Sequence, residues 1–142
     1  MPYTADTEID LSTKIKSNYI ISSQHRKVGN VNKSIWTISF DEEVDCFVTA
    51  INGKWIAGNE AWGVKVNGGS VQVVGKNIAN AELKLAKFVD GTSTNVWHGY
   101  PADYMSKSQD RPITDILRNW VKAGYISKAA MNKIRTGKAC SL

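Results

Sequence analysis

Residues 34–58 read SIWTISFDEEVDCFVTAINGKWIAG, and this stretch decides which kind of fold the sequence predicts. Trp36, Ile38 and Phe40 alternate with small polar residues, which is the period of two of a half-buried strand. Two further apolar runs, DCFVTAI and KWIAG, flank Asn52-Gly53, and Asn-Gly between such runs is a strong signal for a β-hairpin. The acidic run DEEVD would then be a polar turn between two strands rather than a metal site.

The same pattern continues toward the C-terminus. The runs WGVKV and SVQVV flank Asn67-Gly68-Gly69, which predicts a second hairpin whose inner face contains Trp62, Val64 and Val66. Five short strands in succession indicate an antiparallel β meander over about residues 35–75.

The segments on either side of the meander are less decisive. Residues 8–23 permit a helix, and residues 22–30 are expected to form an exposed loop. Residues 80–89 fit a helix capped by Asn80 or a strand that alternates through Leu83 and Leu85, and we favour the helix. Residues 92–110 would then be a long irregular connection, the aromatic loop.

The C-terminal segment, residues 111–138, predicts a helical pair. Pro112 fits a first helical turn, and apolar residues follow it at the spacing of one buried stripe: Ile113, Ile116, Leu117, Trp120 and Val121. Gly124 is a natural helix stop, and Ser127 can cap a second helix. The expected fold is a single α+β domain over residues 1–142, with the meander first and the helical pair last.

Composition limits the classes of function. The formal net charge is +5, and residues 105–142 contain eight basic and two acidic residues, so the positive charge is concentrated at the C-terminal end. Cys46 and Cys140 are far apart and predict reduced thiols, with no metal and no cofactor expected. The sequence has neither a signal-peptide pattern nor a membrane-length apolar run, so we expect a soluble cytoplasmic protein with no membrane partner.

The octapeptide WHGYPADY, Trp97 to Tyr104, is the most reactive-looking stretch. Gly99 indicates a positive φ or a close approach by another group, and Pro101 disfavours a helix at the residue before it. We assign candidate catalytic roles to His98, Tyr100 and Asp103. The candidate ligand-binding residues are the rings that could stack on a base and the basic side chains that could neutralise phosphates: Trp97, Tyr104, Arg111, Arg118, Lys128 and Arg135.

Two alternatives stay open for this octapeptide. Trp97 and Tyr100 could instead fill a gap between the sheet and the helical pair. His25, in the run QHRK, is the only other histidine, and a site that uses both imidazoles would require the two segments to meet in space.

Three functional hypotheses follow from these residues. The first is a binding module for a phosphate-bearing ligand, RNA or a nucleotide, with a metal-independent ribonuclease as its enzymatic form. The second is a non-catalytic protein-interaction or regulatory subunit that meets an acidic partner through the basic helices. The third is catalysis on a small molecule, with His98 as base and Asp103 as the group that orients it.

Overall fold

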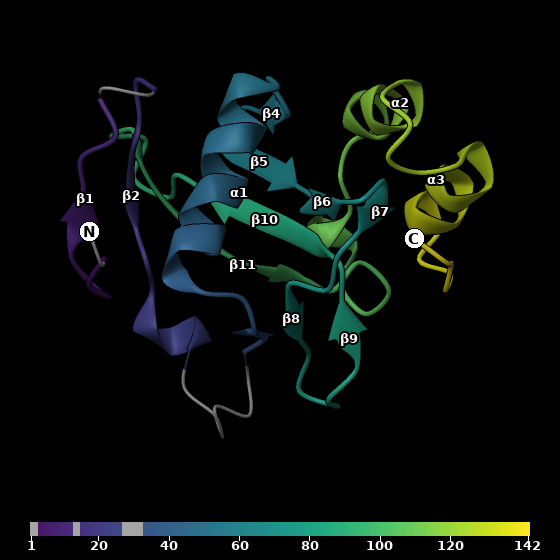
Figure 1. Cartoon of the computed structure of the whole chain (residues 1–142), viewed down its shortest axis with the longest axis horizontal. Helices are drawn as coiled ribbons and strands as arrows, with labels where there is room; N and C mark the ends of the chain where they lie inside the picture. Colours follow the sequence, from purple (N-terminus) through teal and green to yellow (C-terminus); the bar gives the residue numbers. More distant parts are fainter. Residues whose placement is uncertain (1–2, 13–14, 27–32) are drawn as a thin grey trace.

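The computed structural model describes residues 3–12, 15–26 and 33–142, and within them the chain forms a mixed α and β fold (Figure 1). The largest sheet has six strands in the order β1 (Glu8–Ile9), β2 (Asn18–Ile20), β11 (Val96–Ala102), β10 (Leu85–Val89), β5 (Glu60–Gly63) and β4 (Ile56–Ala57). All neighbours in it are antiparallel except β2 and β11, which are parallel.

Smaller elements surround this sheet. A three-stranded sheet contains β3 (Ile35–Trp36), β8 (Gly75–Lys76) and β9 (Glu82–Leu83), and a separate hairpin contains β6 (Val66–Asn67) and β7 (Ser70–Val71). The helices of the described residues are α1 (Phe40–Asn52), α2 (Thr114–Lys122) and α3 (Lys128–Arg135), with the 3-10 turns η1 (Ser23–His25) and η2 (Ser108–Asp110). The expected α+β composition and the C-terminal helical pair are present, but the five-strand meander is matched only in part.

Helix α1 overturns the prediction of a strand and a polar turn over residues 41–51. Ser39 begins the helix with a capping box, in which its Oγ accepts from the Glu42 amide at 3.1 Å and Glu42 Oε1 accepts from the Ser39 amide at 3.0 Å. Val44, Phe47 and Ala50 are buried on one side of the helix. The same apolar residues that suggest a strand therefore also satisfy the helical period, and the capped start favours the helix.

The expected hairpin turn at Asn52-Gly53 is instead the end of α1. The Trp55 amide donates to Ala50 O at 3.0 Å and the Lys54 amide donates to Ile51 O at 3.1 Å, which is the Schellman pattern. Lys54, with φ +60°, occupies the left-handed position that is usually glycine. Gly53 has a negative φ, so no left-handed backbone requires glycine there. A Cβ on it would lie 2.8 Å from Trp55 Cε2, so the indole ring leaves no room for a side chain at this position.

The second predicted hairpin is confirmed at its turn, whereas Trp62, expected on its inner face, lies in β5 of the large sheet. Asn67 pairs with Ser70, and Gly68 and Gly69 between them have φ of +61° and +81°. Two consecutive positive φ values define the tight turn whose twist matches the strands, and glycine adopts them at little cost.

Three further expectations are wrong. Residues 8–23 contain β1 and β2, residues 80–89 contain β9 and β10, and the proposed aromatic loop contains β11, the longest strand. Strand β10, with the sequence LAKFV, lies between β11 and β5 and is almost entirely buried, Lys87 included, so it lacks the alternation by which a half-exposed strand is recognised. Residues 22–30 were expected to form an exposed loop, but His25 within them is buried. Residues 27–30 of this expected loop lie outside the described residues.

The core lies between α1 and one face of the large sheet. Phe47 of α1 packs against the rings of Tyr19, Phe88 and Trp97 at centroid distances of 4.7, 5.3 and 5.8 Å. The helical pair attaches beside this core through Trp120, whose ring meets Trp55 edge to face at 5.6 Å. Helices α2 and α3 therefore lie together at one end of the molecule (Figure 1).

Candidate functional site

Strand β11 separates the residues of WHGYPA between two faces of the large sheet. Trp97 and Gly99 face α1, where Trp97 is 5% exposed and a Cβ on Gly99 would lie 2.7 Å from Tyr19 Oη. His98 and Tyr100 alternate with them and are half-buried on the opposite face. Gly99 is therefore required by a close approach of other side chains rather than by a positive φ, and the first six residues of the octapeptide, Trp97–Ala102, form a strand rather than a loop.

The two histidines meet on this second face. His25 from η1 and His98 from β11 line one cavity of about 230 Å³, together with Lys33, Ser34, Tyr100 and Lys107. These residues come from four separate segments of the chain. We call this space the two-histidine cavity.

Local contacts hold His25 in place. Its ring stacks on Tyr100 at a centroid distance of 5.2 Å and an interplanar angle of 21°, and its Nδ1 lies 2.9 Å from Ser34 O. A carbonyl oxygen only accepts, so Nδ1 must hold the hydrogen. In the neutral ring, Nε2 then has the lone pair and can accept a proton.

A buried ion pair anchors the chain beside His25. Arg26 Nη2 lies 2.6 Å from Glu43 Oε1, and the other oxygen of this fully buried carboxylate accepts from Tyr19 Oη. Arg26 also donates to Ile38 O. Because Arg26 follows His25 directly, these contacts tie η1 to α1 and limit the positions open to the imidazole.

Tyr100 is held as a neutral phenol. Its Oη donates to Asp110 Oδ1 at 3.1 Å, and burial, followed by the charge of Asp110, raises the pKa of Tyr100 well above its usual range. Asp110 is 2% exposed and its second oxygen accepts from the Asp103 amide at 2.8 Å. Tyr100 therefore lines the cavity as a neutral ring whose one hydroxyl hydrogen is donated to Asp110, not as a base.

The segment that contains Lys107 is pinned to the same face of the sheet. Trp62 Nε1 donates to Asp110 O at 3.0 Å, and the buried Lys87 donates to Gln109 O while it pairs with Glu60 at 2.7 Å. Lys107 is exposed at the cavity edge. A cation at that edge can meet an anion without being buried.

Both imidazoles are biased toward the neutral form. Burial lowers the pKa of His25, and the charges of Lys33, His98 and Lys107 lower it further against the opposing hydrogen bond to Ser34. Burial and the charge of Lys33 lower the pKa of His98. A bound anion would counter the lysine charges and favour protonation.

Asp103 does not orient His98. Its Oδ2 accepts from Asn77 Nδ2 at 3.2 Å and its Oδ1 accepts from the Ser106 amide at 3.4 Å. The carboxylate lines an adjacent cavity rather than the two-histidine cavity. The structure thus removes the geometric basis of the His98–Asp103 pair.

The expected ligand-binding residues do not gather at the cavity. Trp97 is buried against Phe47, so its ring is not free to stack on a base. Tyr104 Oη donates to Lys138 O at 2.9 Å, and Arg111 Nε donates to Tyr104 O at 2.8 Å. Tyr104 and Arg111 therefore tie the C-terminal segment to the end of β11.

The remaining basic candidates lie on the helical pair. Arg118 is 69% exposed and 3.8 Å from Asp115, while Lys128 and Arg135 are exposed on α3. None of the three lines the two-histidine cavity. The cations that do line it, Lys33 and Lys107, were not assigned to a site from the sequence. The alternation along WHGYPA was a signal that could have placed His98 and Tyr100 on one face.

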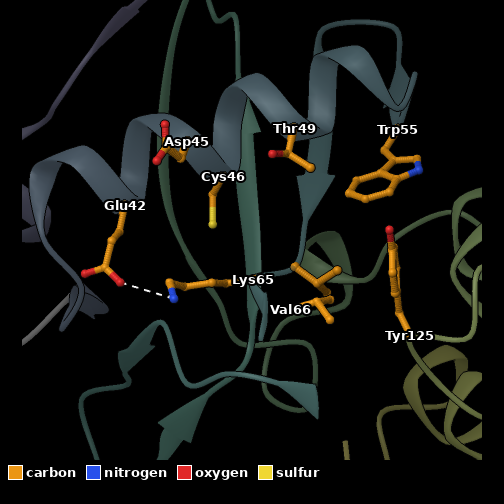
Figure 2. Close-up of a pocket in the computed structure, with 9 residues that line it drawn as sticks. Glu42, Asp45, Cys46, Thr49, Trp55, Lys65, Val66 and Tyr125 are labelled. Atoms are coloured by element: carbon orange, nitrogen blue, oxygen red, sulfur yellow. Dashed lines mark ion pairs between the residues drawn. The ribbon is translucent and has the colours of Figure 1, made fainter. Parts of the chain in front are cut away.

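A second cavity lies between α1 and the segment 64–66 (Figure 2). It has a volume of about 360 Å³, with the Glu42–Lys65 ion pair of 3.2 Å toward one end and Trp55 and Tyr125 toward the other. Cys46 points into it, but burial raises the pKa of that thiol to about 12. The thiol is therefore protonated at neutral pH and is a poor nucleophile.

Two further observations concern metals and membranes. Among residues 3–12, 15–26 and 33–142, no group of three or more His, Cys, Asp or Glu side chains is arranged to hold a metal ion. Within the same part of the chain, no helix combines the length and the apolar surface needed to cross a bilayer.

Comparison with known proteins found no matching family model, and no curated protein or solved structure gave a significant match. Function must therefore be argued from the cavity.

Proposed function

We propose that the two-histidine cavity binds an RNA phosphodiester and cleaves it without a metal ion. The observation that supports this most directly is that two imidazoles distant in sequence line one cavity together with two lysines. Proton transfer by two positioned groups, combined with cations at the developing negative charge, is sufficient chemistry for such a cleavage.

His25 suits the role of general base. Its Nδ1 is committed to Ser34 O, and burial favours the neutral ring, whose Nε2 can take a proton from the ribose 2′-hydroxyl. His98 then serves as general acid, because no hydrogen bond commits its ring in the described structure and a bound phosphate raises its tendency to hold a proton. Lys33 and Lys107 hold the phosphate oxygens.

The reaction balances with these groups alone. The 2′-oxygen loses its proton to His25 and forms a bond to phosphorus, while the bond from phosphorus to the 5′-oxygen breaks and His98 gives that oxygen a proton. The products are a 2′,3′-cyclic phosphate and a free 5′-hydroxyl, and the two histidines have exchanged protonation states. DNA lacks the 2′-hydroxyl and cannot follow this route.

Cleavage of single-stranded RNA in the presence of a chelator tests the proposal. We expect the native chain to cut RNA but not DNA, and His25→Ala and His98→Ala each to lower the rate by roughly 100-fold or more. Lys122→Ala is the matched control, because it removes a positive charge from the exposed surface of α2. An absence of cleavage, or its loss on chelation, would contradict the proposal.

A second candidate is a non-catalytic role in which the helical pair meets an acidic partner. The supporting observation is that the basic side chains of α3 and Arg118 of α2 are exposed and lie outside the cavity. Reversing the charge of Arg118, Lys128 and Arg135 together would then abolish partner binding while RNA cleavage continues. Loss of cleavage in that variant would instead assign the helical pair to the RNA site.

A further inference from the structure

We propose that the cavity next to the two-histidine cavity binds a nucleotide base and prefers guanine, an inference that rests on the proposed ribonuclease function. This second space has a volume of about 270 Å³ and shares Ser34 and Lys107 with the two-histidine cavity. A phosphate held between the histidines and Lys107 would therefore have its nucleoside beside the second space. We call this space the base cavity.

Asp103 gives the base cavity a fixed acceptor. Its two oxygens accept from Asn77 Nδ2 and the Ser106 amide, and its own amide donates to the buried Asp110. Asn77 is held in turn, because its Oδ1 accepts from the amides of Ala79 and Ala81, both at 2.9 Å. A carboxylate has about four lone-pair positions, so each Asp103 oxygen can accept another hydrogen bond.

Guanine complements this arrangement better than the other bases do. Its Watson–Crick edge has two adjacent N–H donors, which match the two oxygens of one carboxylate such as Asp103 in the base cavity. Adenine and cytosine place a ring acceptor beside their amino group, and uracil has one N–H between two carbonyls. Each of these three bases would direct an acceptor lone pair at the Asp103 carboxylate.

Ile78 offers a surface for the face of the base. Its side chain lines the base cavity and is 69% exposed, the highest value among the exposed large hydrophobic residues of the described chain. An aliphatic surface covers the flat face of any base with little selectivity. The base cavity therefore combines one nonselective contact with one selective acceptor.

Affinities of the four nucleoside 3′-monophosphates, measured by calorimetric or NMR titration, test the inference. We expect the guanosine nucleotide to bind about tenfold more tightly than each of the others, a difference typical of one bidentate contact. In Asp103→Asn, the guanosine-to-adenosine affinity ratio should fall about tenfold, because the amide nitrogen presents hydrogens to the guanine donors. Ile78→Ser should weaken all four nucleotides by similar factors.

Mapping the cleavage positions in a mixed-sequence RNA provides a second measurement that needs only the native chain, with cuts expected on the 3′ side of guanosine. Equal affinities for the four nucleotides, or an unchanged ratio in a folded Asp103→Asn variant, would overturn the guanine preference. RNA cleavage without base preference would remove the base cavity and leave the proposed function intact. Failure of both nucleotide binding and RNA cleavage would remove both.

Discussion

At the scale of single residues, the chemistry depends on the environment of each imidazole. His25 is 8% exposed, stacked on Tyr100 and bonded to Ser34 O, while His98 is half-buried with Lys33 near it. Burial is the largest cause that lowers both pKa values. Neutral imidazole is a competent base, but a general acid must retain its proton, so the two roles place opposite demands on pH.

These pKa directions predict an acidic optimum for RNA cleavage. The base works above its pKa and the acid works below its own, so kcat/KM peaks between the two values. Because both pKa values are lowered from 6.5 in the free protein, the peak should lie below pH 6.5, and the rate should fall as pH rises through neutrality. A pH–rate profile measures this, and an optimum above pH 7 would contradict the assignment of these histidines.

At the scale of elements, three helices end in the same hydrogen-bond pattern. The residue in the left-handed position is Gly124 after α2, with φ +82°, and Gly137 after α3, with φ +72°. After α1 that residue is Lys54, with φ +60°. A residue with a Cβ is disfavoured in this region by about 1–2 kcal/mol, so α1 ends at a cost that the other two helices avoid.

Single substitutions at these left-handed positions test directly how each helix end contributes to stability. Lys54→Gly should raise the free energy of unfolding by about 0.5–1 kcal/mol, because glycine removes the strain of the left-handed backbone. Part of this gain is lost, since glycine also increases the conformational entropy of the unfolded chain. Gly124→Ala should lower it by about 1 kcal/mol for the converse reason. Urea unfolding measures both, and a destabilised Lys54→Gly variant would show that the Lys54 side chain has a compensating contact.

At the scale of the whole molecule, the cations of the two-histidine cavity and those of the helical pair form two separate groups. Lys33 and Lys107 line the two-histidine cavity, whereas the cations of α2 and α3 are exposed on the helical pair at one end of the molecule (Figure 1). The net charge of +5 therefore does not describe the field at the cavity. A ligand held at the cavity alone would meet only the first group.

The salt dependence of RNA binding distinguishes these two groups. For single strands the logarithm of affinity falls with the logarithm of salt concentration by about 0.7 for each phosphate neutralised. Contacts from Lys33 and Lys107 alone predict a slope of about −1.4. Participation of the helical pair would make the slope steeper than about −3, and binding that is flat with salt would argue against phosphate contacts altogether.

Some features follow from the sequence alone because they depend on residues only a few positions apart. The Gly68-Gly69 turn, the cap of α3 by Ser127 and the stop of α2 at Gly124 are all closed by hydrogen bonds within one or two turns of chain. Gly99 also indicated a close approach correctly, although not the rings that make it.

The rest was decided by partners far away in sequence. Residues 40–52 are an exception, because the Ser39–Glu42 capping box that favours the helix over the strand is local, and only the packing of the helix's apolar side against the sheet involves distant residues. Strand β11 exists because β10 and β2 pair with its two edges. The meeting of His25 and His98 at one cavity depends on the placement of η1, and the Arg26–Glu43 pair directly beside His25 anchors it. Local periodicity cannot predict such contacts, because the burial of each residue depends on elements that are distant in sequence and come close only in the folded chain.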